Sequence, residues 1–436
     1  MPCLKEYCEK ISHFLSQENI DKNLSATKRR DVREVVSIIN HVVHKIISQC
    51  DSDNDKIDAA TEKAYYHINL ALSKILILTN SKIDNHNSID ILNSFTHIFL
   101  KLGYIDRAIE NSQRTIALAK KFDDLNRQSY LKFCLGKIIA EMGDWHNAIT
   151  QFEEAEQIFK FLKNLQREME SKFELGYAYY EQGRYFMAYD YFDKAVHIAR
   201  EINNTKWLAQ LNNQQGIINR ILGNKEESEA LHHEALEIFR EINDFSGEMI
   251  TLNNLAMINL EKCQYQKTLT FLNDSLNICQ KIGDYHSMAF INLNKAIFYL
   301  EVGDSRHATQ FCTEALEYLS YTNKTRMLAK IYRIYGNVFK NYQQYKLASN
   351  FYEESIRLYE VHHIPLGRAK CCIDYAELLT ETEDIDGAIK YYKLAKEIFE
   401  ELELHNYAEE LEQSITSPQT TLKVKSALKT ITTFHS

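Results

Sequence analysis

The sequence has few of the residues that interrupt helices: 3 proline and 13 glycine residues among 436. Proline lacks the backbone donor that a helix interior needs, and glycine weakens a helix, so their scarcity predicts an almost wholly helical chain with short turns. Long hydrophobic runs are missing as well. A run such as Ile75 to Leu78 is far shorter than the ~20 apolar residues of a membrane span, and we expect no membrane insertion.

Cysteine usage and charge exclude further classes of protein. The nine cysteines are an odd, scattered set without zinc-site spacing, which is typical of small hydrophobic side chains in a reducing compartment. Residues 1–10 have no long apolar core, so we expect no signal peptide and predict a cytoplasmic location. The net charge of −9 disfavours general nucleic-acid binding.

The strongest regularity that is present is a 40-residue period, repeated eight times between residues 88 and 407 without insertion or deletion. A fixed period in this range indicates a stack of supersecondary units. Three positions of the repeat hold a small residue in all eight units, and we call each such set of equivalent residues a column. They are Thr96, Gly136, Gly176, Gly216, Ala256, Ala296, Gly336 and Ala376; Ala108, Ala148, Ala188, Ser228, Thr268, Ala308, Ala348 and Ala388; and Thr115, Ala155, Ala195, Ala235, Ser275, Ala315, Ser355 and Ala395.

Each unit has two helical halves joined by a turn. In residues 128–143 and 144–163, apolar residues recur at helical spacing, which gives each half one buried face. A glycine ends the first half in most units, as suits a left-handed residue after a helix. Cys263, Gln343 and Glu383 replace that glycine in three units, where we expect looser turns or longer helices.

The motifs Leu135-Gly136, Gly143-Asp144, Ala148 and Ala155 resemble the signature of the tetratricopeptide repeat. The 40-residue period and the sequence Thr-Leu-Asn-Asn-Leu-Ala at 251–256 are similar to the long-repeat subgroup of kinesin light chains, LGN-type polarity adaptors and Rap-type bacterial regulators. The resemblance spans residues 88–407. It implies an all-α fold, a right-handed α-solenoid of antiparallel helix pairs.

The ends of the chain depart from the repeat. Residues 1–87 predict an N-terminal helical cap with one degenerate repeat, because terminal units of a stack are atypical. Residues 88–407 hold the eight repeats, and residues 408–415 predict a C-terminal capping helix. Residues 416–436 form a basic tail without acidic residues, which we expect to be flexible or, alternatively, to bind within the chain or to a partner.

The resemblance implies that the first helices line a concave face on which an extended peptide binds. An amide side chain both donates and accepts a hydrogen bond, so it pairs with a peptide backbone whatever the peptide's side chains are. Four amides match asparagines that hold peptides in the long-repeat relatives: Asn213, Asn253, Asn254 and Asn294. The alternative is that these amides cap or bridge neighbouring helices.

Other side chains at inward positions complete the candidate site. Apolar contacts with a ligand are expected from Tyr177, Tyr180, Ile217 and Met257. A basic group suited to an acidic or C-terminal carboxylate group on a ligand comprises Arg220, Lys330, Arg333, Lys340 and Lys370, with Asn337 at a neighbouring inward position. The alternative is a set of solvated charges on a helix surface. The clamp pattern of chaperone-tail binders is missing, so no chaperone partner is predicted.

The sequence offers no catalytic or metal-binding constellation. It has no phosphate-binding glycine loop, nucleophile elbow or paired metal carboxylates, and His232 in an apolar column is predicted to be a core histidine. We therefore predict a cytoplasmic adaptor or regulator that binds a peptide or extended protein segment, uses no cofactor and is not an enzyme. Two alternatives remain: a Rap-like regulator of a signalling protein with phosphatase activity, and a homo-oligomeric scaffold.

Overall fold

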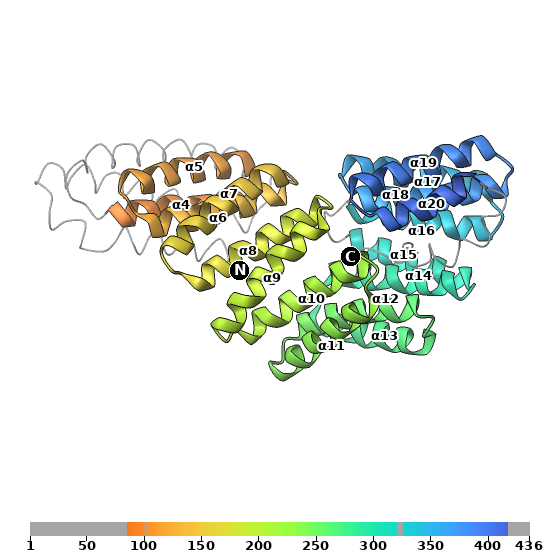
Figure 1. Ribbon diagram of the computed structural model, residues 1–436, viewed down its shortest axis with the longest axis horizontal. Coiled ribbons are helices and arrows are strands. Elements are labelled where there is room, and N and C mark those ends of the chain that lie inside the picture. Colours follow the sequence, from red (N-terminus) through yellow and green to blue (C-terminus); the bar gives the residue numbers. More distant parts are fainter. Residues whose placement is uncertain (1–84, 102, 321–325, 417–436) are drawn as a thin grey trace, which may run out of the picture. The chain divides into compact units, whose positions relative to one another are not determined.

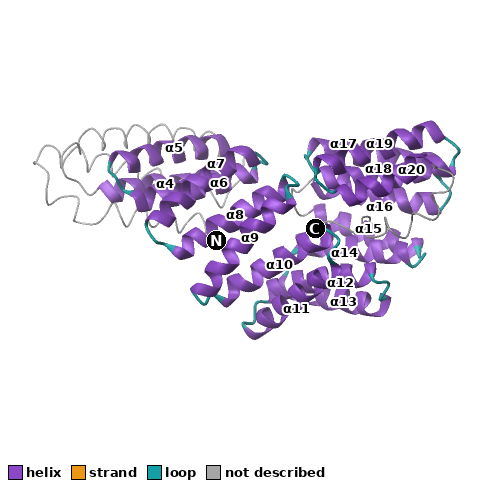
Figure 2. Ribbon diagram, viewed as in Figure 1, coloured by secondary structure: helices purple, strands orange, loops and turns teal. Residues whose placement is uncertain are grey.

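The computed structural model describes residues 85–101, 103–320 and 326–416. These ranges form seventeen helices and contain no strand (Figure 2). The predicted all-α solenoid of antiparallel helix pairs is confirmed. The predicted cap at residues 1–87, apart from its last three residues, and the predicted tail after Thr416 lie outside the described residues.

The helices divide into two compact units between Asn164 and Leu165. In the first unit, two antiparallel pairs follow one another, and the second helix of the first pair packs on the first helix of the next (Figure 1). Its helices are α4 (Asn85–Lys101), α5 (Ile105–Lys121), α6 (Leu125–Glu141) and α7 (Trp145–Phe161).

The second unit is a longer stack of the same kind, with six pairs and one further helix (Figure 1). The first helices of its pairs are α8 (Leu165–Glu181), α10 (Thr205–Ile221), α12 (Phe245–Glu261), α14 (Tyr285–Glu301), α16 (Arg326–Asn341) and α18 (Pro365–Glu381). The second helices are α9 (Tyr185–Glu201), α11 (Lys225–Glu241), α13 (Tyr265–Ile282), α15 (Ser305–Ser320), α17 (Tyr345–Val361) and α19 (Ile385–Glu401). The unit ends with α20 (His405–Thr416), which packs on α19 and takes the register of another first helix.

Close approach of the two helices in a pair depends on the small-residue columns. A Cβ built on Gly136 would lie 2.6 Å from Cε1 of Phe152, so glycine lets that aromatic ring lie against the backbone of the first helix. The Ser228 hydroxyl donates a hydrogen bond to the Gly216 carbonyl at 2.7 Å. This contact joins the first two small columns, as the period predicts.

The turns inside the pairs keep one shape even where glycine is missing. Cys263, Gln343 and Glu383 adopt φ angles of 56°, 58° and 66°, in the left-handed region that Gly143 and its equivalents occupy. Each turn closes with the same backbone hydrogen bonds, for example from the amide of Cys263 to the carbonyl of Leu260 at 2.9 Å. The expected looser turns or longer helices are therefore wrong, because the hydrogen bonds and the packed helices impose the conformation on residues that disfavour it.

Glycine at these three turns is expected to stabilise the chain. Because glycine adopts a positive φ without steric cost, Cys263→Gly, Gln343→Gly and Glu383→Gly should each raise the free energy of unfolding by about 0.5–1 kcal/mol. Urea denaturation measures the effect. The matched control is Gly303→Ala, at φ 82° in the equivalent position, which should lower stability by a similar amount. An unchanged or lower midpoint for all three glycine variants would contradict strain at these turns.

Candidate functional site

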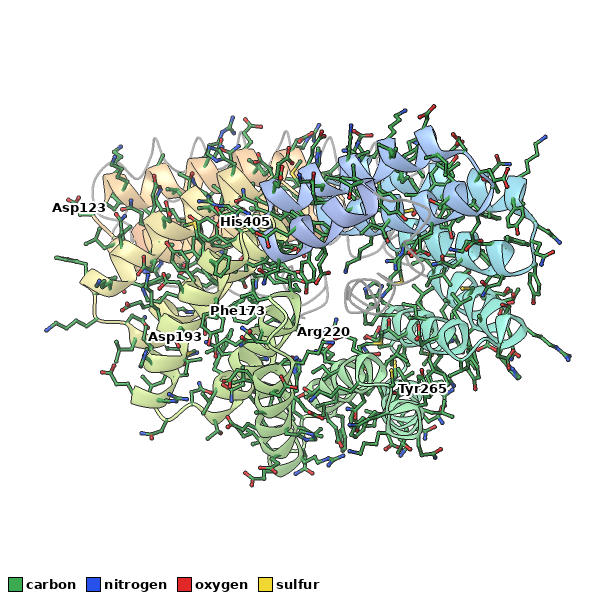
Figure 3. All side chains as sticks on the ribbon, turned by 45° about the vertical axis from the view of Figure 1, so that its right-hand side comes forward. Asp123, Phe173, Asp193, Arg220, Tyr265 and His405 are labelled. Carbon is green, nitrogen blue, oxygen red and sulfur yellow. The ribbon has the colours of Figure 1, made fainter. Side chains whose placement is uncertain are left out.

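The first helices of the second unit form its inner layer. Helix α10 contacts α12, α12 contacts α14, α14 contacts α16, and α16 contacts α18. We call the side of these helices that carries the predicted site residues the inner face. Arg220 lies on it, at the end of α10, whereas Tyr265 belongs to the second helix α13 (Figure 3).

The four predicted amides lie on the inner face and bond to one another in pairs. The Asn254 side chain donates to Oδ1 of Asn213 at 3.2 Å, and the Asn294 side chain donates to Oδ1 of Asn253 at 2.9 Å. All four are buried, with at most 5% of their surface exposed. These contacts join α10 to α12 and α12 to α14, as the bridging alternative describes. Peptide contact through these amides stays a prediction.

Charged side chains continue this row of contacts into the later pairs. Nζ of Lys330 donates to Oδ1 of Asn294 at 3.1 Å, and Nε of Arg333 donates to Oδ2 of Asp374 at 2.7 Å. We call the row that runs from Asn213 to Asp374 the polar ladder. Because Lys330 and Arg333 are buried, the alternative of solvated charges is wrong for both of them.

The remaining basic and amide residues of α16 are held by α17 and α18. The Asn337 side chain donates to Oδ2 of Asp374 at 2.9 Å and accepts from the Tyr352 hydroxyl at 2.6 Å. Nζ of Lys340 contacts the carboxylates of Glu377 at 2.9 Å and Glu381 at 3.5 Å. These residues therefore connect α16 to its neighbours rather than projecting freely into solvent.

The predicted apolar contacts lie toward the beginning of the unit. The rings of Tyr177 and Tyr180 stack with centroids 6.2 Å apart and planes at 30°. Burial, and then the charge of Glu181, raise the pKa of Tyr177, so its hydroxyl stays protonated. Ile217 and Met257 are both buried on α10 and α12.

Residues near the end of the second unit contact helices near its beginning. The Tyr407 hydroxyl of α20 donates to the carbonyl of Ile221, the last residue of α10, at 3.1 Å. The side chain of Leu402 lies against Gly183 in the turn between α8 and α9. An ion pair of 2.7 Å joins Arg326 of α16 to Glu181 of α8. The first two pairs of this unit are therefore in contact with α16, with Leu402 after α19 and with α20.

His232 is a core histidine, as predicted. It is buried against Gly216, and Oδ1 of Asn213 lies 2.7 Å from Nδ1. Because a carbonyl oxygen only accepts, Nδ1 carries the proton. Burial, followed by the charges of Arg220 and His233, lowers the pKa of His232 to about 3, so the ring is neutral at physiological pH.

Asp374 and Glu261 contact the candidate site residues Arg333 and Arg220 and were not predicted from the sequence. Glu261 lies 3.9 Å from Nε of Arg220 and 4.0 Å from Nζ of Lys225. Asp374 had a detectable signal: it occupies the repeat position of Asn254 and Asn294, two residues before the small column. No sequence pattern indicated Glu261, because its contact with Arg220 depends on how α10 and α12 pack.

Neither a metal-ligand cluster nor a membrane-spanning helix occurs among the described residues. No three His, Cys, Asp or Glu side chains in these ranges come together as a metal site requires. Among the described helices, none combines the length and apolarity that crossing a bilayer demands.

Two family models match parts of the chain. The tetratricopeptide repeat model matches residues 167–241, and the model of the soluble NSF attachment protein, SNAP, matches residues 270–411. Residues 167–241 therefore match a tetratricopeptide repeat. No curated protein sequence matches this repeat protein significantly.

Solved structures share the fold of this chain. A Rap protein complexed with competence and sporulation factor is 13% identical, with a TM-score of 0.60 over 85% of this chain and 99% of that one. Aspartyl phosphate phosphatase F from Bacillus subtilis is 14% identical, with a TM-score of 0.56 over 91% and 95%. The apo form of RapI is 18% identical, with a TM-score of 0.55 over 62% and 97%. The predicted likeness to long-repeat, Rap-like proteins is confirmed for the fold.

Proposed function

We propose that this protein is an adaptor or regulator that binds a peptide or extended protein segment on the inner face of its second unit. The observation that carries the proposal is the inner face, where six first helices present one row of aromatic, amide and charged side chains. A Rap protein of the same fold was solved in complex with competence and sporulation factor, which supports ligand binding by such a solenoid.

The polar ladder supplies exchangeable hydrogen bonds. A peptide backbone that reached Asn213 or Asn253 would replace an amide–amide hydrogen bond by an amide–backbone one, and such exchanges cost little net free energy. The Tyr177–Tyr180 stack and Met257 offer apolar contacts beside those groups. An extended segment therefore finds backbone pairing and side-chain contacts on one face.

We also propose that the chain acts in the cytoplasm and has no catalytic activity of its own. Its buried cysteines Cys279, Cys312, Cys371 and Cys372 are free thiols. Burial raises the pKa of Cys279 and of Cys372 to about 12, so these thiols stay protonated and are poor nucleophiles. The negative net charge argues against a nucleic-acid partner.

Site-specific photo-cross-linking tests the binding face by covalent capture at single positions. A benzophenone amino acid would replace Tyr177 or Asn337, both half-buried on the inner face, in the full chain. Matched controls carry it at Leu347 of α17 or Leu316 of α15, which are exposed on second helices. We expect irradiation in lysate to join the same peptide or protein segment to both inner positions and to neither control.

The outcomes separate the binding faces. A segment joined at the second-helix positions only would contradict the inner-face assignment and place binding on the outer layer. A second copy of this chain joined at every position would favour the homo-oligomeric scaffold instead, and mass spectrometry of the cross-linked fragments identifies either product.

A further inference from the structure

Three contacts join helices of the second unit that are far apart in the sequence. We call them the seam: Tyr407 with Ile221, Arg326 with Glu181, and Leu402 with Gly183. The first is a hydrogen bond of 3.1 Å across 186 residues, and the second is an ion pair of 2.7 Å across 145 residues. The third is an apolar contact so close that a Cβ on the glycine would overlap the leucine side chain. Because the repeats of a solenoid pack on their sequence neighbours, these contacts are an addition to the stack.

The seam connects first helices from the two ends of the unit. Glu181 ends α8 and Ile221 ends α10, whereas Arg326 begins α16 and Tyr407 lies in α20. Helices α8, α10 and α16 belong to the inner layer, and α20 takes the register of another first helix. The closed seam therefore fixes the separation of the two ends of the layer that carries the inner face.

The contacts of the seam are weak compared with the packing inside a helix pair. The Arg326 side chain is 47% exposed, and ion pairs that reach solvent stabilise a protein little. The hydrogen bond of Tyr407 joins two neutral groups, whose net contribution is modest. The two helices of a pair, such as α10 and α11, pack along much of their length. We therefore expect the seam to open while the helix pairs stay folded.

The polar ladder is covered while the seam is closed. Asn213, Asn253, Asn254 and Asn294 are at most 5% exposed, and Met257 is 2% exposed. A ligand backbone pairs with these amides only after they become accessible. Movement of α8 and α10 away from α16 and α20 breaks the three seam contacts and keeps the helix pairs intact.

We propose that the seam is an autoinhibitory contact, which holds the inner face out of a ligand's reach until α8 and α10 separate from α16 and α20. This inference rests on the proposed function and adds the regulation of the same face. Glu181 lies one helical turn after Tyr177, so the ion pair of the seam adjoins a predicted ligand contact. The apparent affinity for a ligand falls with the fraction of chains that are open, so the seam sets that affinity.

Distances across the seam test the closure without a ligand. Nitroxides attached through p-acetylphenylalanine at Asp190 of α9 and Lys393 of α19, both exposed, report the separation by double electron–electron resonance in the full chain. Arg326→Gln with Tyr407→Phe removes the ion pair and the hydrogen bond with little change of side-chain size. This seam variant should add a population with longer distances, and each single substitution should give a smaller shift in the same direction.

The matched control leaves the seam intact. Arg357→Gln with Tyr345→Phe breaks an exposed ion pair within α17 and removes the hydroxyl of an exposed tyrosine on the same helix. It carries the same two kinds of substitution, so its distance distribution should equal that of the natural chain.

Cross-linking from the inner face supplies the second readout. The benzophenone amino acid is placed at Asn337 in the natural chain, the seam variant and the control, and each is irradiated in the same lysate. Because opening raises the fraction of binding-competent chains, the seam variant should give about fivefold more of the cross-linked segment than the natural chain. The control should give the yield of the natural chain.

The inference and the proposed function fail in different ways. If the distances in the seam variant match those in the natural chain, the seam does not hold the ends of the unit together and the inference is wrong. If the distances lengthen but the yield at Asn337 does not rise, peptide binding stands and the autoinhibition is overturned. If no segment is joined at Asn337 in any of the three chains, the proposed function is contradicted together with the inference.

Discussion

Asp374→Asn is expected to lower the free energy of unfolding by about 3–5 kcal/mol, the cost of leaving a buried charge without its opposite. Its carboxylate accepts from Arg333 at 2.7 Å and from Asn337 at 2.9 Å, and Arg333 is itself buried. Asparagine keeps the shape of the aspartate side chain but removes its negative charge. Urea denaturation followed by circular dichroism measures the change.

The neighbouring repeat supplies the matched control for this pair. One repeat earlier, the equivalent positions hold Leu293 and Ile334, which are both buried in one hydrophobic cluster. The double variant Arg333→Leu with Asp374→Ile copies that pair and should fold within about 1 kcal/mol of the natural chain, because a buried ion pair is replaceable by packed apolar groups. A loss under about 1 kcal/mol for Asp374→Asn alone would mean that the pair does not hold α16 to α18.

Acid is expected to destabilise the chain through His232. The pKa of this histidine is about 3 in the folded chain and about 6.5 when unfolded, so the unfolded state takes up the proton first as the pH falls. Stability should therefore fall below about pH 6.5, by about 1.4 kcal/mol per pH unit, and the loss at pH 5 should be about 2 kcal/mol. Urea midpoints between pH 7 and 4.5 measure this slope.

Phenylalanine at position 232 should remove most of this acid sensitivity. Phe152 and Phe192 hold the same repeat position and pack on glycine in the same way, so the ring fits against Gly216. His232→Phe should match the natural chain near pH 7 within about 1 kcal/mol and exceed it by about 2 kcal/mol at pH 5. The control His233→Gln alters the exposed neighbour and should leave the slope unchanged. If the stability of His232→Phe and that of the natural chain fall with the same slope as the pH is lowered, the acid sensitivity does not come from His232.

The sequence predicted the fold because each repeat carries the same packing requirements. Gly136 must admit the ring of Phe152, and this requirement recurs at Gly176 and Gly216, so the period alone indicates stacked helix pairs. The shape of individual turns was not predictable from residue preference. At Cys263 the packed helices and their hydrogen bonds outweigh the steric cost of a positive φ.

The candidate site was predicted in part. The predicted side chains lie on the first helices, and their role in binding stays a prediction. Their partners were not predictable, because the polar ladder joins different positions of successive repeats. Asn213 meets Asn254, Asn253 meets Asn294, and Arg333 meets Asp374, each pair 41 residues apart. The contact between Tyr407 and Ile221 spans 186 residues and depends on the accumulated curvature of the unit, which no local pattern reports.

Hydrogen exchange on the full chain, with and without the segment identified by photo-cross-linking, tests the inner face most directly. Binding there should slow backbone exchange in α10, α12, α14 and α16 and leave the second helices α11, α13, α15 and α17 nearly unchanged. Slower exchange confined to the second helices, or to residues outside the described ranges, would contradict the account.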